Sequence, residues 1–396
     1  SGYAGVKASR FSIENMISSL IAFCKQKPLA SLLILAVLLR LSAVWNSTGY
    51  LMHDDHFLVV ETAASWAVGE DYNEWLPGSQ LAAGIENPTP HQANLAYPGF
   101  VWLIFKGLIA TGIDHPATQM LWLRMLHALY SLLIVYFGFR IANRIANRRA
   151  AVWTGLALAG LALLPNLSVR QLVEVICIPP LLWSTWVLVR TDPNSRSIST
   201  FLLAGTGLGL ATALRYQCGV FGLGMAAALL LEARPSGRWK ALLSIFWLGV
   251  SALVVFSLGQ AQDLFIWKRP FAQLQAYFAY NSTHSGAYPQ GAWHQYIWTL
   301  LGLLIPPVSF AWLFGFFRVT KRHALLVLPA LSFLVFHSFF PNKQERFILP
   351  AVPFIIIAGT IGWIAFRQVS SFWKRNRKLE KYLLIGSLAL NGVLAI

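Results

Sequence analysis

The chain has 396 residues, of which 56% are hydrophobic and only 12% are charged. Soluble globular domains carry about 25% charged residues, so the composition excludes a soluble enzyme and a disordered chain and indicates a polytopic membrane protein. Three cysteines exclude a disulfide scaffold, and the net charge of +16 is the one value that a nucleic-acid binder would share.

Apolar runs follow one another along most of the chain. Each is near the length that a bilayer-crossing helix needs. About eleven are present, at 29–46, 124–140, 150–165, 172–190, 199–215, 218–232, 240–260, 295–317, 324–340, 347–366 and 381–396. We therefore expect an all-α membrane protein, with residues 1–28 as a cytoplasmic N-terminal amphipathic segment and residues 29–396 as one transmembrane domain.

The basic residues set the expected orientation, because cytoplasmic loops are enriched in Lys and Arg. All basic clusters share one side only if the shorter apolar run 98–110 does not cross the membrane. We therefore expect that run to be an interfacial or re-entrant helix within a long first external loop, 47–123. Seven acids crowd into residues 54–86 of this loop, and the charge of +16 thus follows from topology and predicts no nucleic-acid partner. These acids are Asp54, Asp55, Glu61, Glu70, Asp71, Glu74 and Glu86.

An acidic pair opens the first external loop. Asp54 and Asp55 directly follow a membrane segment. Adjacent carboxylates repel each other, which raises the pKa of one and can make a general base near neutral pH. The alternative is a solvated acidic loop. His53 and His56 flank the pair but lack the i, i+4 spacing of a helical metal site, so we predict no metal.

The second external loop, 262–296, places small polar residues beside aromatic ones. His284, Tyr288, Trp293 and His294 lie in this segment. Aromatic side chains with polar tips suit the faces and hydroxyl groups of sugars, and they equally suit a bilayer interface. The sequence leaves both interpretations open.

The third external motif, 341–347, carries cations on the face where the positive-inside rule disfavours them. Lys343 and Arg346 can bind an anionic phosphate, Arg through two parallel hydrogen bonds and Lys as a point charge. The helix that starts at this turn adds its N-terminal dipole. The alternative is an interfacial turn with snorkelling side chains.

Further charges lie at the same edge of the membrane. Arg215 ends the fifth apolar run there, and Arg170 and Glu174 open the fourth. Charges at membrane depth are functional candidates, although Arg170 and Glu174 can also form a simple i, i+4 pair. A carboxylate base, aromatic side chains and a cationic anion site on one face favour a glycosyltransferase that uses a lipid-phosphate sugar.

The sequence resembles the GT-C glycosyltransferases of family 22, which include mannosyltransferases that use dolichyl-phosphate-mannose. Three motifs, between about residues 30 and 366, carry the resemblance. They are Asp54-Asp55-His56-Phe57 through Glu61 with Tyr72-Asn73-Glu74-Trp75, then Tyr288-Pro289 to Trp293-His294-Gln295-Tyr296, then Asn342-Lys343-Gln344-Glu345-Arg346-Phe347. Asp55, His53 and Asn342 stand where the family usually has Glu, Pro and His, which leaves the sugar and the acceptor open.

The resemblance implies a GT-C fold and an inverting transfer that needs no metal cofactor. Asp54 would be the general base, and Asp55 would orient Asp54 or the acceptor. The implied donor is a polyprenyl- or dolichyl-phosphate sugar, with mannose as the sugar, and the implied acceptor is a glycan or glycolipid. The donor phosphate would be held by Lys343, Arg346, Arg215 and His284. The acceptor or sugar would be contacted by Glu61, Glu74, Trp75, Tyr288, Trp293 and His294.

Two other classes compete with this interpretation. A transporter or flippase of lipid-linked sugars would carry ionisable residues near mid-membrane and show matched repeats. The interiors of the apolar runs are nearly free of ionisable residues, and no repeat is present. An accessory subunit would lack the base that Asp54 supplies. The short loops favour a bacterial or archaeal cell membrane, with the endoplasmic reticulum membrane as the alternative.

Overall fold

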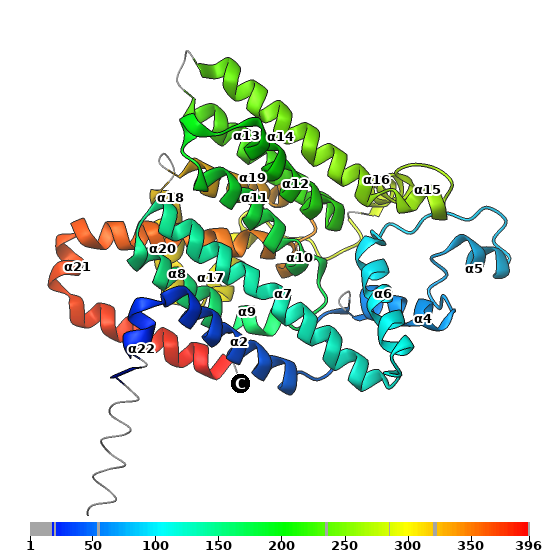
Figure 1. Cartoon of the computed structure of the whole chain (residues 1–396), viewed down its shortest axis with the longest axis horizontal. Helices are drawn as coiled ribbons and strands as arrows, with labels where there is room; N and C mark the ends of the chain where they lie inside the picture. Colours follow the sequence, from blue (N-terminus) through cyan, green and yellow to red (C-terminus); the bar gives the residue numbers. More distant parts are fainter. Residues whose placement is uncertain are drawn as a thin grey trace, which may run out of the picture.

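The computed structural model describes residues 18–19, 21–53, 56–233, 237–284, 286–319 and 323–394. Most of the expected N-terminal amphipathic segment, residues 1–17 and 20, lies outside the described residues. The described part is built from helices (Figure 1) and contains no strand, only an isolated bridge between Gln290 and Asn342. The prediction of an all-α chain is confirmed.

Each expected apolar run contains a helix. Five of the helical segments are long and apolar enough to cross a membrane, at Pro28–Asn46, Pro116–Ile145, Val173–Arg190, Arg238–Ile266 and Glu345–Val369. The helices of the bundle are α2 (Pro28–Asn46), α7 (Pro116–Ile145), α8 (Arg148–Gly160), α9 (Leu163–Leu167), α10 (Val173–Ile176), α11 (Ile178–Arg190), α12 (Ile198–Leu214), α13 (Val220–Glu232), α14 (Arg238–Gly259), α17 (Gln295–Leu303), α18 (Val308–Arg318), α19 (Ala324–Phe339), α20 (Val352–Val369) and α22 (Arg377–Leu394).

Three expected runs are broken, and the run 150–165 becomes α8 and α9. The run 295–317 becomes α17 and α18 because Pro306 and Pro307, which follow Ile305, cannot continue the hydrogen-bond ladder of a helix. The run 172–190 becomes α10 and α11, which meet at Cys177. Three-residue-per-turn segments make the remaining short connections, η2 (Pro193–Ser195), η3 (Tyr216–Gly219) and η5 (Glu345–Ala351).

Glycines let the central helices approach closely. A Cβ built on Gly209 of α12 would lie 2.6 Å from the carbonyl oxygen of Ala252 on α14. Small residues are the usual interface residues between membrane helices, because lipid supplies no hydrophobic drive and close van der Waals packing must replace it. The glycines of α12 thus explain why α12 and α14 pack along each other.

The end of α8 packs inside the bundle, where Leu158 and Ala159 are fully buried. Arg40 of α2 is 1% exposed and donates to the carbonyls of Leu158 and Ala159 at 3.5 Å. Asn391 of α22 donates to the carbonyl of Gly160 at 2.8 Å. Helix ends leave such carbonyls unpaired, and the two side chains satisfy them. Arg40 therefore has a structural role at this break.

The predicted external segments gather at one end of the bundle. Figure 1 shows α4, α5 and α6 at the same end as α15 and α16, whereas α21 (Ser371–Arg375), with Lys374 and Arg375, lies at the opposite end. The first segment contains the π-helical η1 (His56–Glu61), α4 (Thr62–Val68), α5 (Pro77–Ala82) and α6 (Ala96–Ala110), and the second contains α15 (Gln262–Ile266) and α16 (Ala272–His284).

The expected helix at 98–110 is α6. Its buried face packs against α4 and η1 in a separate apolar cluster that includes Val59, Ala63, Val101 and Phe105. This cluster gives the first external segment a small core of its own beside the membrane bundle.

Candidate active site

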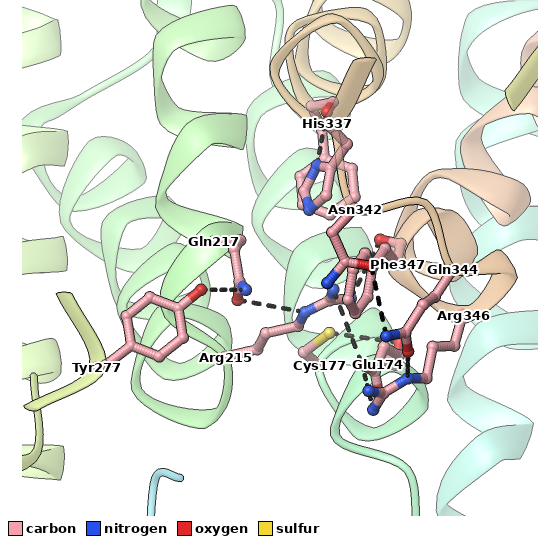
Figure 2. Close-up of polar contacts among 11 residues, drawn as sticks. Glu174, Cys177, Arg215, Gln217, Tyr277, His337, Asn342, Gln344, Arg346 and Phe347 are labelled. Atoms are coloured by element: carbon pink, nitrogen blue, oxygen red, sulfur yellow. Dashed lines mark hydrogen bonds and ion pairs between the residues drawn. The ribbon is translucent and has the colours of Figure 1, made fainter. Parts of the chain in front are cut away.

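A buried ion cluster joins three segments at the end of the bundle that the sequence predicts to be external (Figure 2). One oxygen of Glu174, Oε1, lies 3.7 Å from Nη2 of Arg215 and 3.5 Å from Nη1 of Arg346. The side chains of Glu174 and Arg215 are each 3% exposed. A carboxylate removed from water in this way is stable only next to cations, so the three side chains form one electrostatic unit.

Arg215 directly follows the last residue of α12. The residue is extended, with φ −148° and ψ 110°, and η3 follows it directly. Its Nε donates to Gln217 Oε1 at 3.3 Å, and Gln217 in turn donates to the Tyr277 hydroxyl at 2.5 Å. Its Nη1 donates to the carbonyl of Phe347 at 3.2 Å. Neutral partners thus hold one side of the guanidinium and turn Nη2 toward Glu174.

Aromatic rings enclose the same guanidinium. Its central carbon lies 5.8 Å from the ring centre of Phe333 and 5.7 Å from that of Phe347. Cations are attracted to ring faces within about 6 Å. The rings also exclude water, which strengthens the attraction of Arg215 for any anion nearby.

Arg346 comes from η5. Its Nε donates to Gln344 Oε1 at 2.8 Å, and its guanidinium lies 5.2 Å from the ring centre of Phe347. Two of the four residues predicted to bind the donor phosphate, Arg215 and Arg346, are therefore brought together around Glu174.

Lys343 has a different environment. Its ammonium donates to the carbonyls of His337 at 3.0 Å, Ser338 at 3.1 Å and Phe340, all in or just after the last turn of α19. Burial lowers the pKa of Lys343. All three N–H groups of the ammonium donate to carbonyls at the end of α19. To contact a phosphate directly, Lys343 would have to break one of these hydrogen bonds. That contact stays a prediction.

The second and third external motifs lie side by side. Gln290 and Asn342 form the isolated bridge, Gly291 N donates to the carbonyl of Pro341 at 2.9 Å, and Lys343 N donates to the carbonyl of Pro289 at 3.3 Å. Their common face was expected from topology, and the backbone contacts bring them into direct register.

The predicted site residues of the second loop, His284 for the phosphate and Tyr288, Trp293 and His294 for the sugar or acceptor, form two small groups. His284 stacks on Tyr280 with ring centres 4.5 Å apart, and the Tyr280 and Tyr288 hydroxyls lie 2.5 Å from each other. Trp293 is 71% exposed and meets His294 edge to face at 5.5 Å. These contacts include none between His284 and the ion cluster, so its expected part in binding phosphate stays a prediction.

Of the predicted sugar-binding residues of the first loop, Trp75 and Glu61 have side-chain partners, whereas Glu74 is exposed and makes a backbone contact. Trp75 is 5% exposed and stacks on His91 at 4.0 Å. The carbonyl of Glu74 accepts from Gln80 Nε2 at 2.9 Å. Glu61 Oε1 lies 2.8 Å from His56 Nε2. Trp75 is thus a core residue of this loop in the structure, and a sugar could reach its faces only after rearrangement.

The acidic pair Asp54 and Asp55, which includes the predicted general base, lies outside the described residues. The neighbouring backbone is anchored by arginines, since Arg124 Nη2 and Arg170 Nη1 donate to the carbonyl of Gly49 at 3.1 and 2.8 Å. The ion pairs that the structure describes for Glu174 are with Arg215 and Arg346, and the i, i+4 pair with Arg170 that the sequence offers as one alternative stays a prediction.

The sequence indicated Glu174 as a charged functional candidate but not its partners, and it did not indicate Gln217, Tyr277 and Gln344 as members of the site. The available signal was Glu174 itself, an acid at the start of an apolar run, because such acids need a partner at membrane depth. Its partners are separated from it by 41 and 172 residues, so spacing along the chain could not reveal them. Within the described ranges no group of three His, Cys, Asp or Glu side chains could hold a metal ion.

The fold and these contacts define a polytopic membrane protein of the GT-C class. Residues 30–396 match the Alg9-like mannosyltransferase family. The chain belongs to that family, as the sequence motifs predict. None of the curated protein sequences matches it.

Solved structures show the same fold. ArnT from Cupriavidus metallidurans bound to undecaprenyl phosphate is 15% identical, with a TM-score of 0.57 over 86% of this chain and 60% of that one. The archaeal oligosaccharyltransferase AglB from Archaeoglobus fulgidus, in complex with an inhibitory peptide and a dolichol-phosphate, is 13% identical, with a TM-score of 0.53 over 94% and 55%. The chain thus spans 55–60% of the length of these relatives.

Proposed function

We propose that the chain transfers mannose from a polyprenyl-phosphate donor to a hydroxyl group of a glycan or glycolipid on the external face of a membrane. The observation that carries the proposal is the buried cluster of Arg215, Glu174 and Arg346 at the external end of the bundle. Membership of the Alg9-like mannosyltransferase family supports the sugar. The polyprenyl phosphates bound to ArnT and AglB support the donor class.

In the proposed reaction, the acceptor oxygen attacks the anomeric carbon from the side opposite the phosphate. Asp54, assigned from the sequence, takes the proton of the acceptor hydroxyl. The bond between the anomeric carbon and the phosphate oxygen breaks, and its electron pair stays on that oxygen. The configuration at the anomeric carbon is inverted.

The cations would act on the leaving group. As the bond breaks, negative charge grows on the phosphate, and preorganised guanidinium groups stabilise such charge most effectively in a site without water. Arg215 Nη2 and Arg346 Nη1 point to the same atom of Glu174. Phosphate oxygens placed next to that atom would be within reach of both.

Because the protein's own cations can carry the charge of the leaving group, we propose that the transfer needs no metal. We propose a bacterial or archaeal cell membrane as the location, with the active site outside. Asp55, Glu61, Glu74, Tyr288, Trp293 and His294 remain proposed contacts of the acceptor or sugar.

The test is a transfer assay on the purified chain in lipid, with a mixed glycolipid extract as acceptor. Donors are polyprenyl-phosphate-mannose, polyprenyl-phosphate-glucose and nucleotide sugars, each with and without EDTA. We expect the mannose lipid alone to be consumed, at a rate that EDTA leaves unchanged. Loss of activity with EDTA would contradict metal independence. If no lipid-phosphate sugar is consumed, the proposal fails, and translocation of the sugar lipid across vesicles would test the transporter interpretation.

A further inference from the structure

Glu174 is an unexpected member of a site for an anion. Its side chain is 3% exposed, and its Oε1 faces both guanidinium groups. Its second oxygen, Oε2, is buried and has no hydrogen-bond partner in the described part of the chain. A carboxylate between two phosphate-binding arginines competes with the phosphate, so a site selected only for the tightest phosphate binding would not keep it.

The lengths of the contacts show which interactions hold the arginines in place. Charge-assisted hydrogen bonds are usually about 2.7–2.9 Å long, and the two contacts with Glu174 measure 3.5 and 3.7 Å. Arg346 is held to Gln344 at 2.8 Å, and Arg215 is held to the Phe347 carbonyl at 3.2 Å. A ligand could therefore take the guanidinium atoms that face Glu174 while the neutral partners keep both arginines in position.

We propose that Glu174 sets the charge of this site so that it accepts the phosphodiester donor and disfavours the phosphate monoester product. The inference rests on the function proposed above. Two guanidinium charges and one carboxylate charge leave the three groups with one net positive charge. A sugar phosphodiester carries one negative charge and balances it.

Transfer changes the charge of the ligand. It converts the diester into a monoester whose second pKa is about 6, so the product carries close to two negative charges at neutral pH. The three groups and the product together would then hold one unbalanced negative charge, and an unbalanced charge in a buried site is costly. Glu174 thus acts as a specificity-determining residue that favours release of the lipid phosphate after each transfer.

The experiment measures binding of two ligands that differ in one charge, undecaprenyl phosphate and its methyl phosphodiester, to the full chain in nanodiscs. Glu174→Gln removes the charge and keeps the shape, and Glu174→Asp keeps the charge. Glu86→Gln removes an exposed acid from the first external loop and serves as the matched control. Dissociation constants at pH 8 and pH 5 are compared between variants.

Coulomb energy is proportional to the charge of the ligand, so removing one negative charge from the site helps a doubly charged ligand twice as much in free energy. At pH 8 we expect Glu174→Gln to lower the dissociation constant of the diester about threefold and that of the monoester about tenfold. At pH 5 both ligands carry one charge, and the two gains should become equal. Glu174→Asp and Glu86→Gln should leave the preference between the ligands as it is in the unmodified chain.

Other titratable groups near the cluster are present in every variant, so comparison between variants at one pH separates their titration from that of the ligand. These groups are Lys343, Glu345, His337, Cys177, Cys218, Tyr277 and Tyr296.

The outcomes distinguish the two proposals. If the unmodified chain binds neither ligand, the donor class proposed above is wrong. If it binds both, and Glu174→Gln changes them equally at pH 8, the function stands and the role of Glu174 is refuted. If Glu174→Gln does not fold, the test uses the unmodified chain alone. Its affinity for the monoester should fall relative to its affinity for the diester as the pH rises from 5 to 8. A ratio of the two affinities that stays constant would refute the inference.

Discussion

Replacing Arg215 by methionine tests the proposed leaving-group site. Methionine keeps an unbranched stem as far as the position of Nε and removes the rest of the guanidinium; the Arg215 side chain is 3% exposed and donates to Gln217 and to the Phe347 carbonyl. Glu174 keeps its contact with Arg346 at 3.5 Å, so the carboxylate is not stranded without a cation. We therefore expect the variant to fold, with a lowered thermal unfolding midpoint.

The expected loss of activity follows from the contact that is removed. A hydrogen bond to a charged partner contributes about 1.5–3 kcal/mol, and the value lies at the upper end where water is excluded and charge grows in the transition state. A loss of roughly 3 kcal/mol corresponds to about a hundredfold decrease in kcat/KM for the donor. Arg215→Lys keeps the charge but lacks the planar, forked guanidinium, and its kcat/KM for the donor should fall about tenfold.

The assay is the initial rate of mannose transfer from polyprenyl-phosphate-mannose at several donor concentrations. Arg318→Met is the matched control, because Arg318 ends α18 and its guanidinium contacts only the rings of Phe314 and Phe366 among the contacts described. Its rate should stay within about twofold of the unmodified chain, as for surface changes away from the site. If Arg215→Met retained a third or more of the activity, the phosphate site would have to lie elsewhere.

Three further predictions concern the other parts of the site. Arg346→Ala should raise the KM for the donor and lower kcat/KM by about tenfold or more, measured in the same assay, and unchanged donor kinetics would count against the cluster. Asp54→Asn should fold normally and lose transfer, and activity in that variant would remove the assigned base. Burial lowers the pKa of His91 to about 4, below the usual value of 6.5. The unfolded chain therefore binds more protons between these values, and stability should be complete above pH 6.5 and fall as the pH drops toward 4. Protease cleavage of the first external loop should follow this curve, and His91→Phe, which keeps a ring against Trp75, should flatten it; a pH profile that does not change would contradict this role.

The sequence predicts the membrane bundle well because local rules determine it. Length and hydropathy locate every apolar run, and the run 98–110 is a helix, α6, in the structure. Its place in an external loop, inferred from the distribution of basic residues, stays a prediction. The break between α17 and α18 could have been foreseen, since Pro306 and Pro307 are visible in the sequence.

The details of the site depend on long-range packing and could not be read from the sequence. Lys343 has the residue type of a phosphate ligand, but its position next to the end of α19 commits it to carbonyl groups. Trp75 has the residue type of a sugar platform, but His91 covers it. Glu174 looks like a local partner of Arg170, and only the fold brings Arg215 and Arg346 to it.

The most direct test of the central claim is the stoichiometry of the reaction in proteoliposomes. Polyprenyl-phosphate-mannose labelled in both the sugar and the lipid is supplied with acceptor, and the products are separated over time. The account predicts one polyprenyl phosphate released for each mannose that appears on an acceptor hydroxyl, with inversion at the anomeric carbon. Release of free mannose alone, retention of configuration, or movement of intact donor across the bilayer without transfer would contradict it.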